Sequence, residues 1–417
     1  MRRTMRRLSA SFLPLLFLAL PCPATAHAQD VACAVGAPVP DTEQAEAGAE
    51  PNAPAGAPRE LRNLATGAGV KVAVIDTGVA RHPQLNQLAG GADFVTPDTP
   101  EPFKDCDAHG TVVAGIIAGT QTGIAPGAEV LSIRQSSAHY RRPSPPAGGN
   151  GEEAPPGAGD LETLTRAIHN ALDEKAAVIN TSVVSCVEPE VAPRVDTRGI
   201  EEALGRAERD GAVVVAAAGN MSHQCPAGST VYPAHFPTVL AVGARADAHT
   251  VADYSLPVPD GTVLVTAPGE VSRALAPGTH GWSAGKAGER GAVEPFAGTS
   301  FAAPVVSGTA ALLRQRYPHA TPAQIRDMIV SSAEPHGGAV DPLRAVSFVE
   351  REQHPDTAPL RVTPAETVES AAPAKGSFTV VAVVLAAALA AAAGALRRIL
   401  LPGAGDVSTS RSKRLRG

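Results

Sequence analysis

Runs of apolar residues, separated by longer stretches with helical periodicity, begin near residue 70 and continue to about residue 345. Six of these runs are short, rich in Val, Ile and Ala, and apolar on both faces, which is typical of central strands in a parallel sheet. They are VKVAVI (70–75), AEVLSIR (128–134), KAAVINTSVV (175–184), GAVVVAAAG (211–219), TVLAVGA (238–244) and TVLVTAPG (262–269). The pattern predicts a buried, mostly parallel sheet.

Between these runs the apolar positions follow the period of a helix. The stretch 160–175 carries one apolar face, and 197–209 repeats the pattern less strongly. The apolar face of 160–175 consists of Leu161, Leu164, Ile168 and Leu172. A third helix is predicted at Thr321, with Pro322 in its first turn and Gln324 closing a capping box. Alternating strands and helices predict an α/β domain, in which active residues gather at the carboxyl ends of the strands.

Several segments lie outside this pattern. Residues 29–69 form an N-terminal extension, rich in Ala, Pro, Gly and Glu up to residue 60, ahead of the domain at 70–349. Within the domain, residues 136–159 carry Pro, Gly and charge, so we expect an exposed inserted loop; the alternative is a partner-docking or autocleavage segment. A similar stretch, 350–377, is predicted to be a linker.

Both ends of the chain carry targeting signals. Residues 1–28 combine a basic head, a short apolar run and a small-x-small site, which predicts a secretory signal peptide cleaved before Gln29 rather than a membrane anchor. Residues 378–396 are uncharged for 19 positions and are followed by a basic tail, 397–417. This predicts a single transmembrane helix with an extracytoplasmic domain and a cytoplasmic tail. The alternative is a buried, alanine-rich helix.

Composition narrows the class of protein. The chain has 417 residues, is 44% hydrophobic and carries a formal charge of −6. This charge, without a dense basic stretch before the C-terminus, argues against nucleic acid as a partner. Aromatic residues make up only 3%, so the core must be packed mainly with aliphatic side chains, as suits a parallel sheet.

The cysteines point to an oxidising compartment. Cys22 would leave with the signal peptide, which leaves four cysteines in the exported chain. They are Cys33, Cys106, Cys186 and Cys225. An even count in an exported chain favours two disulfides over free thiols or zinc, and three connectivities are open. No ligand-spaced acidic loop is present, so we expect no metal and no cofactor.

Four polar residues lie at the predicted strand ends and helix starts, where active residues are expected in this fold class. Asp76 and Asn220 follow the apolar runs that end at residues 75 and 219, and His109 opens a helix pattern of small residues. Ser300 lies in GTSFAAPVVSG, at the start of an apolar helix. Asp-Thr-Gly at residues 76–78 also occurs in aspartic proteases, but these need two such carboxylates and this chain has one.

These residue types suit acyl transfer. Serine needs a base to take its proton, and neutral imidazole serves near pH 7. A buried carboxylate fixes the other imidazole nitrogen and stabilises the imidazolium. The Asn220 carboxamide and the Ser300 backbone N–H would stabilise the oxyanion.

Four segments closely resemble motifs of the subtilisin-like serine proteases, and their candidate residues follow the chain order Asp, His, Ser. The segments are VAVIDTGV, HGTVVAGIIAG, AAAGN and GTSFAAPVVSG. The resemblance covers about residues 70–345 and implies a three-layer α/β fold, with a mostly parallel central sheet and helices on both faces. It also implies that Asp76, His109 and Ser300 are the triad and that Asn220 completes the oxyanion hole.

The resemblance further implies a substrate-binding strand and a specificity pocket. The substrate-binding residues would be Ser182, Val183, Val184, Ala217, Ala218 and Gly219, with Tyr232 to Ala234 near the pocket floor. This chain departs from the family in three places. Val183 and Val184 replace the usual Leu-Gly, which should narrow the pocket, and Phe301 replaces a methionine. Residues 29–69 are too short for a folded inhibitory propeptide.

These departures, with the two ends and the cysteines, resemble the mycosins, membrane-anchored subtilisin-like proteases of the type VII secretion system. That resemblance implies an extension that wraps the catalytic domain, and the disulfides Cys33–Cys106 and Cys186–Cys225.

Three functions follow as hypotheses. The first is a cell-surface endopeptidase that processes a secreted protein of its own export system. The second is a structural component of the secretion channel with dispensable proteolysis. The third is a nutrient-scavenging protease, which the anchor and the short extension argue against.

Overall fold

The computed structural model describes residues 32–39, 59–140, 159–279, 281–335, 338–348 and 376–400. The chain divides into two compact units, Met1–Glu350 and Arg351–Gly417. The predicted signal peptide, most of the linker and all but the start of the basic tail lie outside the described residues, as do positions 141–158 of the inserted loop.

The first unit is built on a seven-stranded sheet in which all neighbouring strands are parallel. In spatial order the strands are β10 (Val263–Pro268), β9 (Val239–Arg245), β7 (Val213–Ala217), β5 (Val178–Thr181), β2 (Lys71–Asp76), β4 (Glu129–Arg134) and β3 (Leu88–Asp93). The predicted parallel sheet is therefore confirmed. The sequence pattern missed β3, and it extended β5 too far, because the chain leaves the sheet after Thr181.

The alternation of side chains along β2 explains why helices cover both faces. Val72 and Val74 point into one buried cluster, while Ala73 and Ile75 point into the other. All four are fully buried, and burying a Val or Ile side chain stabilises a fold by about 1.5–3 kcal/mol. A strand that is apolar on both faces therefore requires a cover on each side, which gives three layers.

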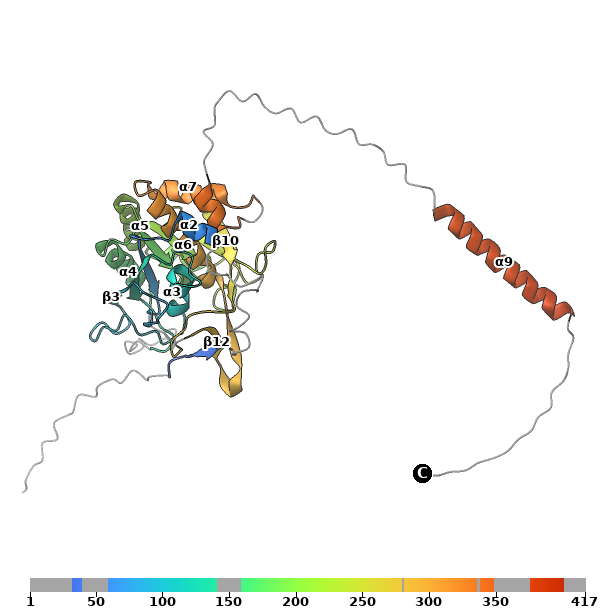
Figure 1. Cartoon of the computed structure of the whole chain (residues 1–417), viewed down its shortest axis with the longest axis horizontal. Helices are drawn as coiled ribbons and strands as arrows, with labels where there is room; N and C mark the ends of the chain where they lie inside the picture. The colour runs from blue at the N-terminus through green and yellow to red at the C-terminus, as the bar shows by residue number, and fades with distance from the viewer. Residues whose placement is uncertain are drawn as a thin grey trace, which may run out of the picture. The chain divides into compact units, whose positions relative to one another are not determined.

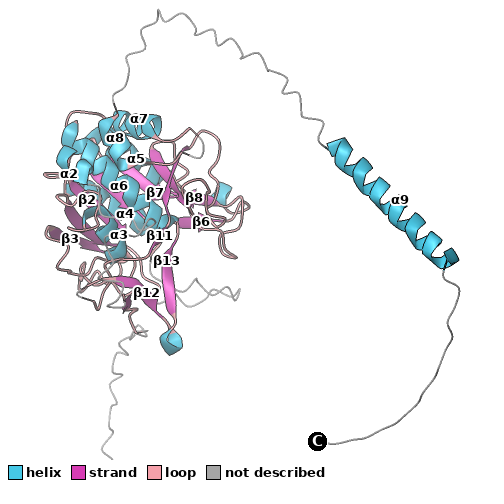
Figure 2. Cartoon of the chain, turned by 45° about the vertical axis from the view of Figure 1, so that its right-hand side comes forward, coloured by secondary structure: helices cyan, strands magenta, loops and turns pink. Residues whose placement is uncertain are grey.

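The helices supply these covers. On one face lie α3 (Gly110–Ala118) and the long α6 (Thr299–Arg316), which pack against each other. On the other face lie α4 (Leu161–Asp173) and α5 (Arg198–Asp210), side by side in Figure 1. Figure 2 shows the helices and strands of this unit together. The predicted three-layer α/β class is confirmed.

Shorter helices complete the unit: α2 (Arg59–Leu64), α7 (Pro322–Ser332), α8 (Pro342–Ser347) and the 3-10 turns η1 (Ala192–Arg194) and η2 (Glu289–Gly291). The capping box predicted at the start of α7 is present: Gln324 N donates to Thr321 Oγ1 at 3.2 Å, and Thr321 N donates to Gln324 Oε1 at 2.8 Å.

A second, antiparallel sheet brings distant parts of the chain together. Its order is β1 (Gly36–Pro38), β12 (Ser283–Ala287), β13 (Val293–Ala297) and β11 (Glu270–Val271). Figures 1 and 2 show β12 at the end of the domain opposite α7. A small ribbon pairs β6 (Ser185–Val187) with β8 (Thr230–Tyr232). The N-terminal extension thus contributes a strand to the domain.

The start of the predicted exposed loop differs from expectation. Ser137 and Tyr140 are buried, and Tyr140 packs beside Cys106. Tyr140 also stacks against Arg134, with the guanidinium 4.5 Å from the ring centre. The remaining described part of the chain is α9 (Gly376–Leu400) in the second unit. Among the described residues, no helix has the combined length and apolar character needed to cross a membrane.

The structure contains the disulfides Cys33–Cys106 and Cys186–Cys225, the pairing that the resemblance implies. The first joins the extension to the loop before α3. The second ties the β6 strand to the loop ahead of β8.

We expect Cys33→Ala to destabilise the domain. The Cys33–Cys106 bridge spans 73 residues, and closing a loop of this size stabilises a fold by about 4 kcal/mol, or roughly 8–16 °C in melting temperature. Thermal melting and a thiol count on the denatured chain measure the effect, with one extra free thiol expected from Cys106. An unchanged melting temperature and thiol count would show that the bridge is not structural.

Candidate active site

The parallel sheet places the candidate residues at one edge. Asp76 is the last residue of β2, Ser182 follows β5, and Asn220 lies shortly after the end of β7. Because β2, β5 and β7 are consecutive neighbours in the parallel sheet, their carboxyl ends meet at the same edge.

Asp76 and His109 are joined directly. His109 Nδ1 lies 2.7 Å from Asp76 Oδ1, and Asp76 is fully buried. The same oxygen accepts a hydrogen bond from Thr77 N at 2.8 Å. Since an ionised carboxylate only accepts, His109 Nδ1 carries the hydrogen, and Nε2 is left as the basic nitrogen. This is the tautomer that a general base needs.

The electrostatic surroundings favour the imidazolium form of His109. Burial alone lowers the pKa of His109, and Lys286 acts in the same direction. The charge and hydrogen bond of Asp76, together with the charge of Asp105, outweigh these effects, so the pKa of His109 lies above its ordinary value of 6.5.

Ser300 lies in the first turn of α6. The ring of the next residue, Phe301, packs on His109 with centroids 5.0 Å apart. In the described part of the chain no hydrogen bond joins the Ser300 hydroxyl to His109. The residue that follows Ser300 therefore contacts the imidazole, and hydrogen bonds between catalytic groups are often long in enzymes without substrate.

Asn220 is oriented by its carbonyl oxygen. Asn220 Oδ1 accepts from Thr299 N at 2.9 Å and from Thr299 Oγ1 at 3.0 Å. Thr299 Oγ1 in turn accepts from Gly219 N at 3.2 Å. Because both partners of Oδ1 are donors, the opposite end of the carboxamide is the NH₂ group, which remains available to another acceptor.

Gly298 has no side chain, which leaves a small space open between Asn220 and Ser300. A Cβ atom built on Gly298 would lie 3.0 Å from Asn220 Nδ2 and 3.1 Å from Ser300 Oγ. The φ angle of Gly298 is +155°, which side chains rarely adopt. A donor and a nucleophile therefore converge on one small volume at the N-terminus of α6, where the helix dipole also favours a negative charge.

The predicted substrate-binding residues are distributed as follows. Ser182 is buried and accepts from Asn180 Nδ2 at 2.9 Å, whereas Val183 and Val184 are half-buried. Ala217 packs in the hydrophobic core. Ala218 is fully buried, and the φ angle of Gly219 is +99°. Of these side chains, those of Val183 and Val184 are exposed enough to meet a ligand.

A cavity of about 560 Å³ adjoins the candidate site. Its walls include His109, Val183, Asp107, Lys286 and Glu294. Lys286 and Glu294 face each other across the β12–β13 pair, with Nζ and Oε1 3.4 Å apart. Lys286 also lies opposite Gly36 of β1, so the extension helps to build this wall. The sequence pattern did not indicate the hairpin residues because β12 and β13 are short segments interrupted by Gly, Pro and charged residues.

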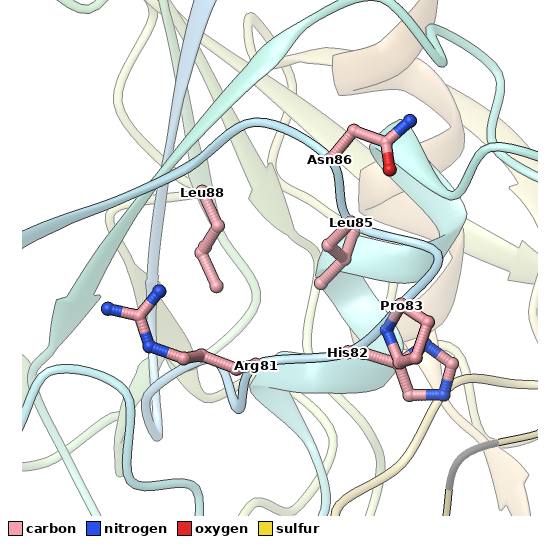
Figure 3. Close-up of a pocket in the computed structure, with 6 residues that line it drawn as sticks. All are labelled: Arg81, His82, Pro83, Leu85, Asn86 and Leu88. Atoms are coloured by element: carbon pink, nitrogen blue, oxygen red, sulfur yellow. The ribbon is translucent and has the colours of Figure 1, made fainter.

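A second cavity, of about 370 Å³, lies in the segment between β2 and β3 (Figure 3). It is lined by Arg81, His82, Pro83, Leu85, Asn86 and Leu88. The Arg81 guanidinium lies 4.0 Å from the Phe103 ring centre, and His82 is buried with both ring nitrogens in contact with the backbone. No candidate nucleophile lines this cavity. Among the described residues, no group of three His, Cys, Asp or Glu side chains is arranged to hold a metal ion.

We expect Asn220→Ala to slow acylation of Ser300 without unfolding the protein. The variant loses the NH₂ group beside Ser300, and removing one oxyanion donor lowers turnover by about 10²–10³-fold. The rate of covalent labelling by a fluorophosphonate measures the loss, and thermal melting checks the fold. A labelling rate equal to that of the wild type would show that Asn220 has no such role.

Comparison with known proteins identifies the family. Residues 67–362 match the family model described as "Subtilase family". Mycosin-4 of Mycobacterium tuberculosis (strain ATCC 25618 / H37Rv) is 40% identical over 318 residues, which cover 69% of this chain and 67% of that protein. Mycosin-1 of Mycolicibacterium smegmatis (strain ATCC 700084 / mc(2)155) is 36% identical over 340 residues, covering 73% and 74%.

Solved structures agree. The crystal structure of MycP1 from Mycobacterium smegmatis aligns with a TM-score of 0.65 and 31% identity, covering 80% of this chain and 93% of that one. A chain in the structure of an intact ESX-5 inner membrane complex aligns with a TM-score of 0.66 and 28% identity, covering 89% and 95%. The chain belongs to the subtilase family of serine endopeptidases, among the mycosins.

Proposed function

We propose that this chain is a membrane-anchored, extracytoplasmic endopeptidase in which Ser300 is the nucleophile, His109 the general base and Asp76 the group that orients it. The observation that carries the proposal is the 2.7 Å contact between His109 and Asp76, at the sheet edge where Asn220 and Ser300 converge.

The chemistry follows from these positions. His109 Nε2 takes the Ser300 hydroxyl proton as Oγ attacks the peptide carbonyl carbon. Asp76 accepts from Nδ1 and stabilises the imidazolium. The carbonyl oxygen becomes an oxyanion that accepts from Asn220 Nδ2 and Ser300 N. His109 then gives its proton to the leaving amine, and water repeats the steps on the acyl-enzyme.

The substrate is an extended peptide that runs along residues 182–184. The half-buried Val183 and Val184 would pack against its side chains, and Val184 narrows the pocket where the family has glycine. The cavity beside His109 has the volume to take a large neighbouring side chain. Residues 217–219 support this surface from within.

The anchor is the uncharged stretch 378–396, followed by a basic cytoplasmic tail at 397–417. With a signal peptide at 1–28, the domain at 70–349 would be exported and then tethered through the linker at 350–377. Similar chains come from an ESX-5 inner membrane complex and its periplasmic assembly, which supports this location. The substrate would then be a protein of the type VII secretion system.

We expect a fluorophosphonate to label the full-length wild-type chain but not its Ser300→Ala variant. An activated serine in an open site attacks the phosphorus, whereas alanine has no nucleophile. In-gel fluorescence after labelling, with a heat-denatured wild-type sample as control, measures this. If neither folded chain is labelled, the site is blocked or inert and proteolysis by Ser300 is rejected.

A structural role in the secretion channel is a second candidate, favoured by the matches to chains of the ESX-5 inner membrane complex and its periplasmic assembly. We expect Ser300→Ala to restore export in a strain that lacks the gene if this role suffices. Secreted protein in the culture medium measures export. If only the wild type restores export, catalysis is required and the structural candidate fails as the sole function.

A further inference from the structure

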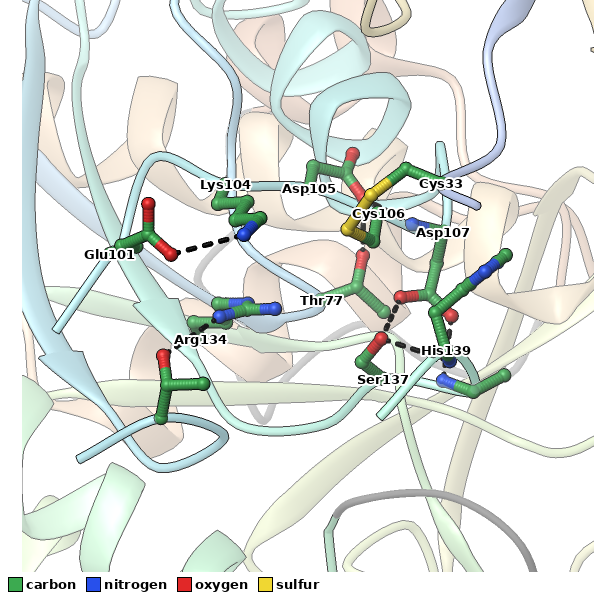
Figure 4. Close-up of a disulfide and its surroundings, with 12 residues drawn as sticks. Cys33, Thr77, Glu101, Lys104, Asp105, Cys106, Asp107, Arg134, Ser137 and His139 are labelled. Carbon is green, nitrogen blue, oxygen red and sulfur yellow. Dashed lines mark hydrogen bonds and ion pairs between the residues drawn. A yellow bond between two sulfur atoms is a disulfide. The ribbon is translucent and has the colours of Figure 1, made fainter. Parts of the chain in front are cut away.

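A buried carboxylate that the proposed mechanism does not use lies four residues before His109. Asp105 is only 5% exposed and directly precedes Cys106 of the first disulfide (Figure 4). None of the described cationic side chains forms an ion pair with it. A buried, unpaired negative charge is costly, so its surroundings must stabilise it in another way.

Hydrogen bonds provide this stabilisation. Asp105 Oδ1 accepts from Thr77 Oγ1 at 2.8 Å, from Asp107 N at 3.2 Å and from His109 N at 3.4 Å. Asp105 Oδ2 accepts from Thr111 N at 2.9 Å and from Thr111 Oγ1 at 2.6 Å. The donors belong to the residue after Asp76, to His109 itself and to the first turn of α3.

The direction of each hydrogen bond can be assigned. Thr77 Oγ1 accepts from Gly110 N at 3.0 Å, and Thr111 Oγ1 accepts from Ala80 N at 2.9 Å. The Thr111 hydroxyl thus donates its single hydrogen to Asp105. The Thr77 hydroxyl lies 2.8 Å from Asp105 Oδ1 and 3.3 Å from Asp76 Oδ1, so its shorter hydrogen bond goes to Asp105. The other three partners are backbone N–H groups, which only donate. Five donors around one carboxyl group fit the ionised form. A protonated Asp105 would place a sixth hydrogen among them.

Asp105 also affects the pKa of His109. Its negative charge is among the causes that raise the pKa of His109, after Asp76. The other charged group that acts on His109 is Lys286 of β12, which lowers the pKa. Asp107, His139 and Glu294 line the same cavity. Burial, together with the negative charge of Asp76, raises the pKa of Asp105 itself above its ordinary value, and the hydrogen bonds from Thr111 and Thr77 offset part of that rise.

We propose that Asp105 is a positioning residue: its ionised carboxylate, through Thr77 and Thr111, holds His109 against Asp76 and stabilises the imidazolium that forms when His109 takes the Ser300 proton. The inference rests on the proposed function. It assigns a role to a residue that touches neither substrate nor the reacting atoms.

Asp93 provides a matched comparison within the chain. It is also 5% exposed, and it accepts from Val95 N, Thr96 N, Thr96 Oγ1, Glu101 N and Arg134 NH1. Its charge is balanced by the buried Arg134, and its partners lie around the end of β3. Two carboxylates of equal burial therefore differ in their partners: Asp93 pairs with Arg134, whereas Asp105 has neutral donors and is connected to Asp76 and His109.

The test measures the rate of fluorophosphonate labelling of the full-length chain between pH 5 and 9. The rate rises as His109 loses its proton. Asp105→Asn removes a negative charge that stabilises the imidazolium, so the pKa of His109 falls and the midpoint moves to lower pH, by about one unit. The plateau rate at high pH falls by about ten-fold, because the base is weaker and less well held.

Asp93→Asn is the control, and we expect a lower melting temperature with an unchanged midpoint. The Thr111 hydroxyl donates to Asp105 and does not contact Asp76, whereas the Thr77 hydroxyl contacts both carboxylates. We therefore expect Thr111→Val to slow labelling, while Thr111→Ser keeps the hydroxyl and restores the rate. If Asp105→Asn does not fold, the comparison of the Val and Ser variants tests the proposal in its place.

The inference is overturned if Asp105→Asn keeps the wild-type midpoint and plateau, if Thr111→Val labels like the wild type, or if Asp93→Asn shifts the midpoint equally. A wild-type chain without any labelling rejects the proposed function instead. In that case the titration of His109, followed by NMR in Ser300→Ala with and without Asp105→Asn, still reports the coupling, and an identical pKa in both overturns it.

Discussion

A carboxylate with no exposed surface, Asp76, sets the main constraints on this site. A buried charge needs donors, and Asp76 Oδ1 accepts from His109 Nδ1, from Thr77 N and, at 3.3 Å, from the Thr77 hydroxyl. That requirement fixes the tautomer of His109 and leaves Nε2 free for proton transfer. The parallel sheet then adds the other groups, because strands that end beside β2 deliver Asn220 and residues 182–184 to the same edge. The geometry of the proposed active site is therefore a consequence of strand order and of one buried charge.

The N-terminal extension belongs to this site. Its strand β1 pairs with β12, which carries Lys286 toward the cavity beside His109, and Cys33 holds the loop that contains Asp105. The loop before α3 is thus fixed from outside by a covalent bond and from inside by five hydrogen bonds. The described part of the extension is therefore joined both to β12 and to the loop that precedes His109.

The sequence predicted those parts of the fold that are governed by burial. Strands apolar on both faces revealed six of the seven strands of the central sheet, and short motifs indicated the residues that meet at its edge. The strand β3, LAGGAD, was missed because it lies at the sheet edge, is largely half-buried and has few apolar side chains. Asp105 and Lys286 were missed for another reason: their roles arise from contacts between segments distant in the sequence, and no local period records such contacts.

Asp93 and Asp105 are equally buried carboxylates that are stabilised in different ways. Arg134 neutralises the charge of Asp93, so this ion pair stabilises the end of β3 and has little electrostatic effect on groups farther away. A cation beside Asp105 would likewise make the loop more stable, but it would also oppose the positive charge that His109 acquires during catalysis. Lys286 already acts in that opposing direction. Neutral donors solve both problems, because they satisfy the oxygens of Asp105 and leave its negative charge acting on the imidazole.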